Sequence, residues 1–162
     1  MKQIDEIGTK LCKAQANVFA ASITETSSSS AIFLRRYMNS DFAKRMDKGN
    51  YLFEADSEKS VIAEIEEQFG KTGYGKEKYS ENELYWMGFL YRYWCYTYEK
   101  SSKQVYKIIK PQELRTLFFP YHTLDTAAAI ERILEAKSQR EIDLTNRGVE
   151  ILRGLMKKKN LI

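Results

Sequence analysis

Histidine and cysteine, the side chains that most often act as nucleophiles, proton carriers and metal ligands, are scarce in this chain. His122 is the only histidine, and Cys12 and Cys95 are the only cysteines. A histidine can activate a thiol as a nucleophile, so a pair of His122 with either cysteine is formally possible. Each cysteine sits among apolar residues, however, and burial raises the pKa of a thiol and makes it inert. We expect two buried free thiols, and at His122 a residue that orders the turn before a helix.

Other patterns that could carry chemistry are weak. Without a second histidine or a ligand-type cysteine spacing, no metal site is expected. The segment GKTGYGKEKY, residues 70–79, has the glycines and lysines of a phosphate-binding loop, but it lacks the Gly-Lys-Ser/Thr ending and a preceding strand. The carboxylates near residues 64–67 are typical of a solvated helix face. We therefore expect a flexible loop at 70–79, no catalytic site and no cofactor.

Length and composition are those of one globular domain. The chain has 162 residues, of which 43% are hydrophobic and 13% aromatic. Its first residues include Lys2, Gln3, Asp5 and Glu6 and lack the apolar run of a signal peptide. No window offers the roughly 18 uncharged apolar residues that a membrane span needs. We expect a cytoplasmic protein without a membrane partner.

Apolar periodicity and capping signals predict an all-α fold, a single-domain bundle of six to eight helices around a central helix at residues 81–99. Residues 1–137 form the expected core, and residues 138–162 a basic C-terminal helical extension. The net charge of +4 lies entirely between residues 137 and 162. Tyr51 to Phe53 is short, apolar and expected to be extended. Helices are expected at 3–23, 31–47 (as one helix or as two halves meeting at 39–40), 58–69, 81–99, 103–109, 111–119, about 124–137, and from about 145.

The central segment, residues 81–99, is unusually rich in tyrosine and tryptophan. Ser80 followed by Glu83 is a capping box that favours a helix, although aromatic residues also suit a strand. On a helical wheel apolar side chains point almost everywhere, which favours burial on several sides. The alternative is an aromatic wall that faces a groove. Arg92 is costly to bury alone, so we expect it to pair with Glu99 or Glu81.

Two basic segments could contact nucleic acid. Residues 101–110 are similar to the turn and second helix of a helix-turn-helix, although the turn lacks glycine. The C-terminal segment adds further cations that could reach phosphates, among them Arg147 and Arg153. The candidate nucleic-acid-binding residues are Lys103, Gln104, Lys107, Lys110, Lys157, Lys158 and Lys159.

The C-terminal segment also carries an apolar stripe. A helix with such a stripe can dock in the groove of a partner protein or on a second copy of itself. Alternatively, it is simply the last helix of the bundle. The candidate partner-binding residues are Val149, Leu152, Arg153, Leu155 and Met156.

Two stretches, residues 27–47 (SSSSAIFLRRYMNSDFAKRMD) and residues 91–133 (YRYWCYTYEKSSKQVYKIIKPQELRTLFFPYHTLDTAAAIERI), resemble a group of small, uncharacterised bacterial proteins. That group is associated with toxin–antitoxin-like gene pairs. The resemblance implies a non-catalytic protein that binds and restrains a partner protein, such as a toxin encoded nearby. The favoured function is therefore an antitoxin-like or regulatory protein-binding module; the alternative is a DNA-binding regulator, and a small-molecule enzyme comes third.

Overall fold

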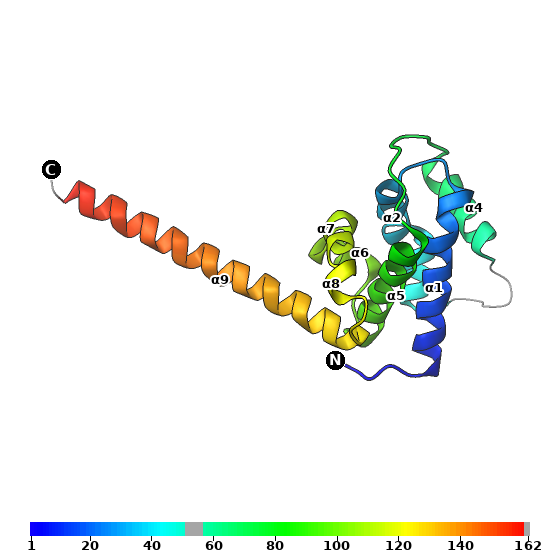
Figure 1. Ribbon diagram of the computed structural model, residues 1–162, viewed down its shortest axis with the longest axis horizontal. Coiled ribbons are helices and arrows are strands. Elements are labelled where there is room, and N and C mark those ends of the chain that lie inside the picture. The colour runs from blue at the N-terminus through cyan, green and yellow to red at the C-terminus, as the bar shows by residue number, and fades with distance from the viewer. Residues whose placement is uncertain (51–56, 161–162) are drawn as a thin grey trace. The chain divides into compact units, whose positions relative to one another are not determined.

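The computed structural model describes residues 1–50 and 57–160, and every regular element in this part is a helix (Figure 1). The all-α prediction is thus confirmed. The segment 51–53, which we expected to be extended, lies outside the described residues. The helices are α1 (Glu6–Glu25), α2 (Ser30–Met38), α3 (Asp41–Asp47), α4 (Glu58–Phe69), α5 (Glu81–Thr97), α6 (Ser102–Ile108), α7 (Pro111–Thr116), α8 (Phe118–Tyr121) and α9 (Thr126–Lys159).

The chain divides into two units. Unit 1 spans Met1–Thr126 and contains α1 to α8, whereas unit 2 spans Ala127–Ile162 and contains α9 except for its first residue. We predicted two helices here, one ending near residue 137 and one beginning near Thr145, but α9 is one continuous helix of 34 residues. Residues 138–144 hold neither glycine nor proline and are mostly good helix formers, so nothing ends the helix there.

Serine side chains begin most of the helices of unit 1. In each case the hydroxyl oxygen accepts a hydrogen bond from the backbone N–H three residues later, which would otherwise lack a partner within the helix. The predicted capping box of Ser80 and Glu83 is confirmed, and Ser101 with Gln104 forms a second one. Ser40 caps α3, which explains why residues 30–47 form two helices. The capping serines are Ser29, Ser40, Ser57, Ser80 and Ser101.

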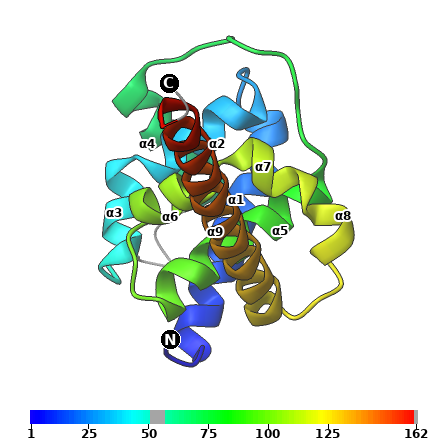
Figure 2. The same cartoon turned by 90° about the vertical axis from the view of Figure 1, so that its left-hand side faces the viewer.

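One side of α5 forms the core of unit 1. This helix packs most extensively on α1 and also contacts α6, α7 and α8 (Figures 1 and 2). The approach to α1 depends on Gly88, where an added Cβ would lie 2.9 Å from the Cα of Ala16. The buried apolar residues on this side of α5 are Leu84, Met87, Leu90, Tyr91 and Trp94.

The other side of α5 is only partly covered. Tyr85 is exposed, and Trp86, Phe89, Tyr93 and Tyr96 are half-buried. The aromatic segment is therefore core on one side and an open wall on the other, so each of the two alternatives describes part of it. Tyr91 donates to the Ile109 carbonyl oxygen at 2.7 Å and Tyr96 to the Asp5 carboxylate at 2.7 Å, whereas the buried indole N–H of Trp94 has no hydrogen-bond partner among the described residues.

Arg92 is the largest charged side chain in the core, with 1% of its surface exposed. We predicted Glu99 or Glu81 as its partner, and this was wrong. Its guanidinium instead donates from Nη1 to Asp47 Oδ1 at 2.6 Å, from Nη2 to Ser102 Oγ at 2.8 Å and from Nε to Gln15 Oε1 at 2.8 Å. Glu81 is exposed at the start of α5 and Glu99 is exposed just after its end, whereas the actual partners come from α1, α3 and α6.

Replacing Asp47 by alanine should destabilise the protein strongly. The substitution leaves the buried Arg92 guanidinium without a carboxylate, and breaking a buried ion pair in this way costs about 3–5 kcal/mol. The free energy of unfolding from urea titration measures the effect. Asp41→Ala is the matched control, because its pair with Lys44 is exposed and should matter by less than about 1 kcal/mol. Equal losses in the two variants would contradict a central role for Arg92.

Replacing Gly88 by alanine should also destabilise the protein, by about 1–3 kcal/mol, because the new Cβ meets the α1 backbone. Gly148→Ala and Gly154→Ala are the controls. Nothing lies within 4 Å of a Cβ at either position, so there alanine should raise helix stability by about 1 kcal/mol. Thermal unfolding followed by circular dichroism measures all three. A Gly88→Ala protein as stable as the parent would show that α1 and α5 have room to separate.

Candidate functional site

The second half of α9 carries a broad apolar surface, which we call the apolar face of α9. At 100° per residue its members cover about half of the helix circumference. Between 40% and 68% of each side chain is exposed, and a single helix cannot bury them on itself. The apolar face consists of Ile142, Leu144, Val149, Ile151, Leu152, Leu155 and Met156.

On the same part of α9, the other half of the helix circumference is polar and mostly basic, and we call it the polar half. Four of the five predicted partner-binding residues belong to the apolar face, and the fifth, Arg153, lies on the polar half beside its border. Ile142, Leu144 and Ile151 were not among the predicted residues, although a wheel over the whole continuous helix would have found them. The polar half between residues 143 and 158 contains Asp143, Asn146, Arg147, Glu150, Arg153, Lys157 and Lys158.

The residues predicted to contact nucleic acid fall into two groups in different units. In unit 1, Lys103 and Lys107 are exposed one turn apart on α6. The side-chain oxygen of Gln104 already has a partner, because it accepts a hydrogen bond from the Ser101 N–H at 2.9 Å. Lys110 places its Nζ 4.0 Å from the Tyr106 ring centre. Lys157, Lys158 and Lys159 end α9 in unit 2. DNA binding by these residues stays a prediction.

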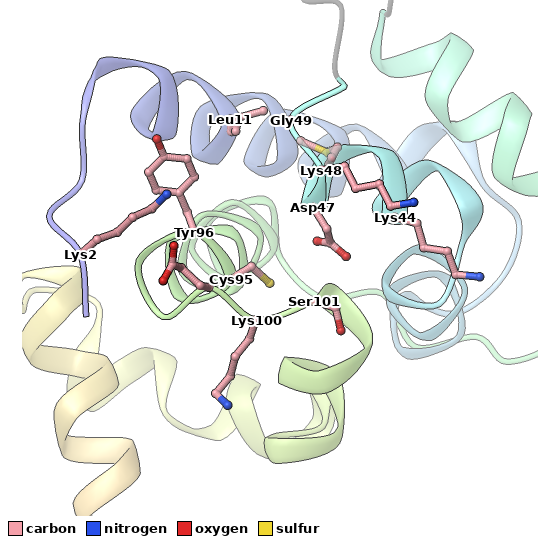
Figure 3. A pocket seen from close by; sticks show the side chains of 12 residues that line it. Lys2, Leu11, Lys44, Asp47, Lys48, Gly49, Cys95, Tyr96, Lys100 and Ser101 are labelled. Carbon is pink, nitrogen blue, oxygen red and sulfur yellow. The ribbon is translucent and has the colours of Figure 1, made fainter.

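A cavity of about 560 Å³ lies beside the Arg92 network, between residues of α1, α3, α5 and the start of α6 (Figure 3). Its lining includes four lysines, but their charges do not converge. Lys2 places its Nζ 4.0 Å from the Tyr96 ring centre, and the ammonium groups of Lys44 and Lys100 extend away from Asp47 in Figure 3. The Asp47 carboxylate already accepts three hydrogen bonds from Arg92 and Ser102. The cavity therefore lacks the convergent polar groups of a ligand site.

Both cysteines are buried and free, as predicted. Burial raises the pKa of Cys12 to about 12 and that of Cys95 to about 11, and the nearby Arg92 charge offsets only part of this effect. Both thiols are therefore protonated at neutral pH and are poor nucleophiles. In the part of the chain that the structure describes, no group of three histidine, cysteine or acidic side chains could hold a metal ion. None of the described helices combines the length and the apolar character of a membrane span.

His122 orders the turn after α8, as predicted. Its Nδ1 lies 2.9 Å from the Phe118 carbonyl oxygen and 3.0 Å from that of Phe119. The ring also stacks on Phe118, with ring centres 4.6 Å apart. With Asn82, Tyr85, Trp86 and Phe89 of α5, these residues line an open groove of about 480 Å³, which we call the aromatic groove. The α5 residues of this groove recur at helical spacing in the sequence, so their shared face could be predicted. No pattern in the sequence predicts that α8 lies beside them.

Neither native thiol should react with a disulfide reagent at pH 8 while the protein is folded. The raised pKa values lower the thiolate fraction at that pH by about 100-fold or more relative to an ordinary cysteine, and burial blocks access. Both should react at once in guanidinium chloride. Tyr74→Cys, at an exposed loop position, provides a thiol that should react in the folded state. Rapid labelling of the folded parent protein would contradict the burial of Cys12 and Cys95.

The comparison with known proteins adds no assignment to these surfaces. The resemblance to toxin–antitoxin-like gene pairs remains a prediction. No family model matches the chain, and no curated protein or solved structure is significantly similar to it.

Proposed function

We propose that this chain is a non-catalytic protein-binding module, antitoxin-like or regulatory, that engages a partner protein through the apolar face of α9. The observation that carries the proposal is the exposure of seven large apolar side chains on one half of the circumference of α9. Single exposed apolar residues are normal on protein surfaces, but a contiguous set of this size is typical of a binding surface.

The width of the apolar face favours a partner with a groove. A two-stranded coiled coil covers only the narrow stripe formed by two positions of each heptad. Here one such stripe contains Ile142, Val149 and Met156, and a second stripe beside it contains Leu144, Ile151 and Leu155. Pairing along the first stripe would leave the second in water. A groove between two helices of another protein would cover both at once.

The charges that border the apolar face favour an acidic partner. Basic side chains dominate the polar half beyond residue 144, and Lys157, Lys158 and Lys159 end the helix. Carboxylates along the rim of the groove would raise the association rate and set the direction in which α9 lies. A protein that restrains a toxin needs no chemistry of its own, so the resemblance to toxin–antitoxin-like gene pairs supports the same proposal.

Co-expression with the product of the adjacent gene tests the proposal. The unaltered chain should co-purify with that product and restore the growth of cells that express it. A double variant, Leu152→Glu with Leu155→Glu, places two carboxylates in the buried interface and should weaken binding by about 100-fold or more. Isothermal titration calorimetry with the purified partner measures the affinity.

Asn146→Glu with Gly154→Glu is the matched control, because it adds the same charge on the polar half of α9. This control should bind within about a factor of five of the parent. If the apolar-face variant binds as tightly as the parent, α9 is not the docking element. If the parent neither binds the adjacent gene product nor protects cells from it, the antitoxin-like proposal fails.

A further inference from the structure

The aromatic groove between α5 and α8 is a second apolar surface, and it lies wholly within unit 1. Trp86 meets Phe118 edge to face, with ring centres 5.7 Å apart, and Phe118 stacks on His122. The outer rings are less covered, since Phe119 is 85% exposed and Tyr85 is 38% exposed. The rings of Phe119 and Tyr85 thus remain in contact with water, where a flat apolar ligand would gain free energy by covering them.

Hydrogen bonding leaves one ring nitrogen of His122 free for a ligand. Both contacts of Nδ1 are to carbonyl oxygens, which can only accept, so Nδ1 carries a hydrogen and donates it. In the neutral ring Nε2 then holds a lone pair and can accept a hydrogen bond. The amide of Asn82, at the end of the groove formed by α5, has no hydrogen bond to any described residue.

Charge restricts the class of ligand further. The described residues that line the groove include no lysine, arginine, aspartate or glutamate. A phosphate or carboxylate group would lose hydration there without gaining an opposite charge. The volume of about 480 Å³ lies within the range of small-molecule sites. The lining thus suits a neutral, planar molecule of modest size.

We propose that the aromatic groove binds an uncharged planar heteroaromatic molecule that carries an N–H group, of the indole type. The ring system lies against the side chains of Trp86, Phe118 and Phe119, and the ligand N–H donates a hydrogen bond to Nε2 of His122. Because it uses α5 and α8, this site is independent of the apolar face of α9 and goes beyond the proposed function.

Isothermal titration calorimetry of the full chain with indole and with 1-methylindole tests this assignment. The two probes have nearly the same shape, but only indole has an N–H donor. Indole should bind with a dissociation constant at or below about 1 mM, and 1-methylindole about five to ten times more weakly, as expected for the loss of one hydrogen bond. His122→Phe keeps an aromatic ring beside Phe118 but removes Nε2, so it should weaken indole binding by the same factor and leave 1-methylindole binding unchanged.

Phe119→Ala should weaken the binding of both probes, because it removes one of the ring faces. Tyr74→Ala is its control, since that ring is also exposed but lies in the loop before α5, and it should change neither affinity. Circular dichroism confirms that each variant is folded. The proposal is overturned if indole does not bind at about 5 mM, if 1-methylindole binds as well as indole, or if Phe119→Ala leaves both affinities unchanged. It is also overturned if a folded His122→Phe protein binds indole as well as the parent.

Discussion

The arrangement of unit 1 depends on the need of one buried cation for oxygen partners. Arg92 projects from α5 into a region closed to water, and an unpaired guanidinium there would be prohibitively costly. Its three hydrogen bonds reach Gln15 on α1, Asp47 at the end of α3 and Ser102 at the start of α6. Gln15 also donates from its amide nitrogen to the Gly88 carbonyl oxygen at 3.0 Å, which links this network to the closest point between α1 and α5. A shift of any of these helices would break several of these bonds together, so the network defines their relative positions.

Helix-capping signals in the sequence were reliable because the hydrogen bonds they predict form within one helical turn. A serine at a helix start satisfies backbone N–H groups within its own turn, so Ser57 and Ser80 could be read without knowing the fold. Contacts between residues that lie far apart in the sequence could not be predicted in this way. Nothing near Arg92 in sequence indicates a carboxylate 45 residues away. The prediction of two helices in place of α9 was also wrong, because residues 138–144 contain no glycine or proline that would end a helix.

Of the two candidate surfaces, one could be predicted from the sequence and the other could not. The stripe on α9 could be predicted because periodicity along one helix decides which residues share a face. The aromatic groove could not, because it forms only where α8, a helix of four residues, lies beside α5. Such short elements carry almost no periodic signal. Phe118, Phe119 and His122 therefore line a groove only because the fold brings them beside α5.

The two tryptophans of the chain occupy opposite kinds of environment. Trp94 is completely buried, and its indole Nε1 has no hydrogen-bond partner among the described residues, whereas Trp86 lines the aromatic groove. Replacing Trp94 by phenylalanine would therefore break no hydrogen bond, and the variant would lose only packing contacts. Trp94 would then be removable as a fluorophore, and the emission of the remaining indole would provide an optical reporter of events at the surface of α5, separate from the interior.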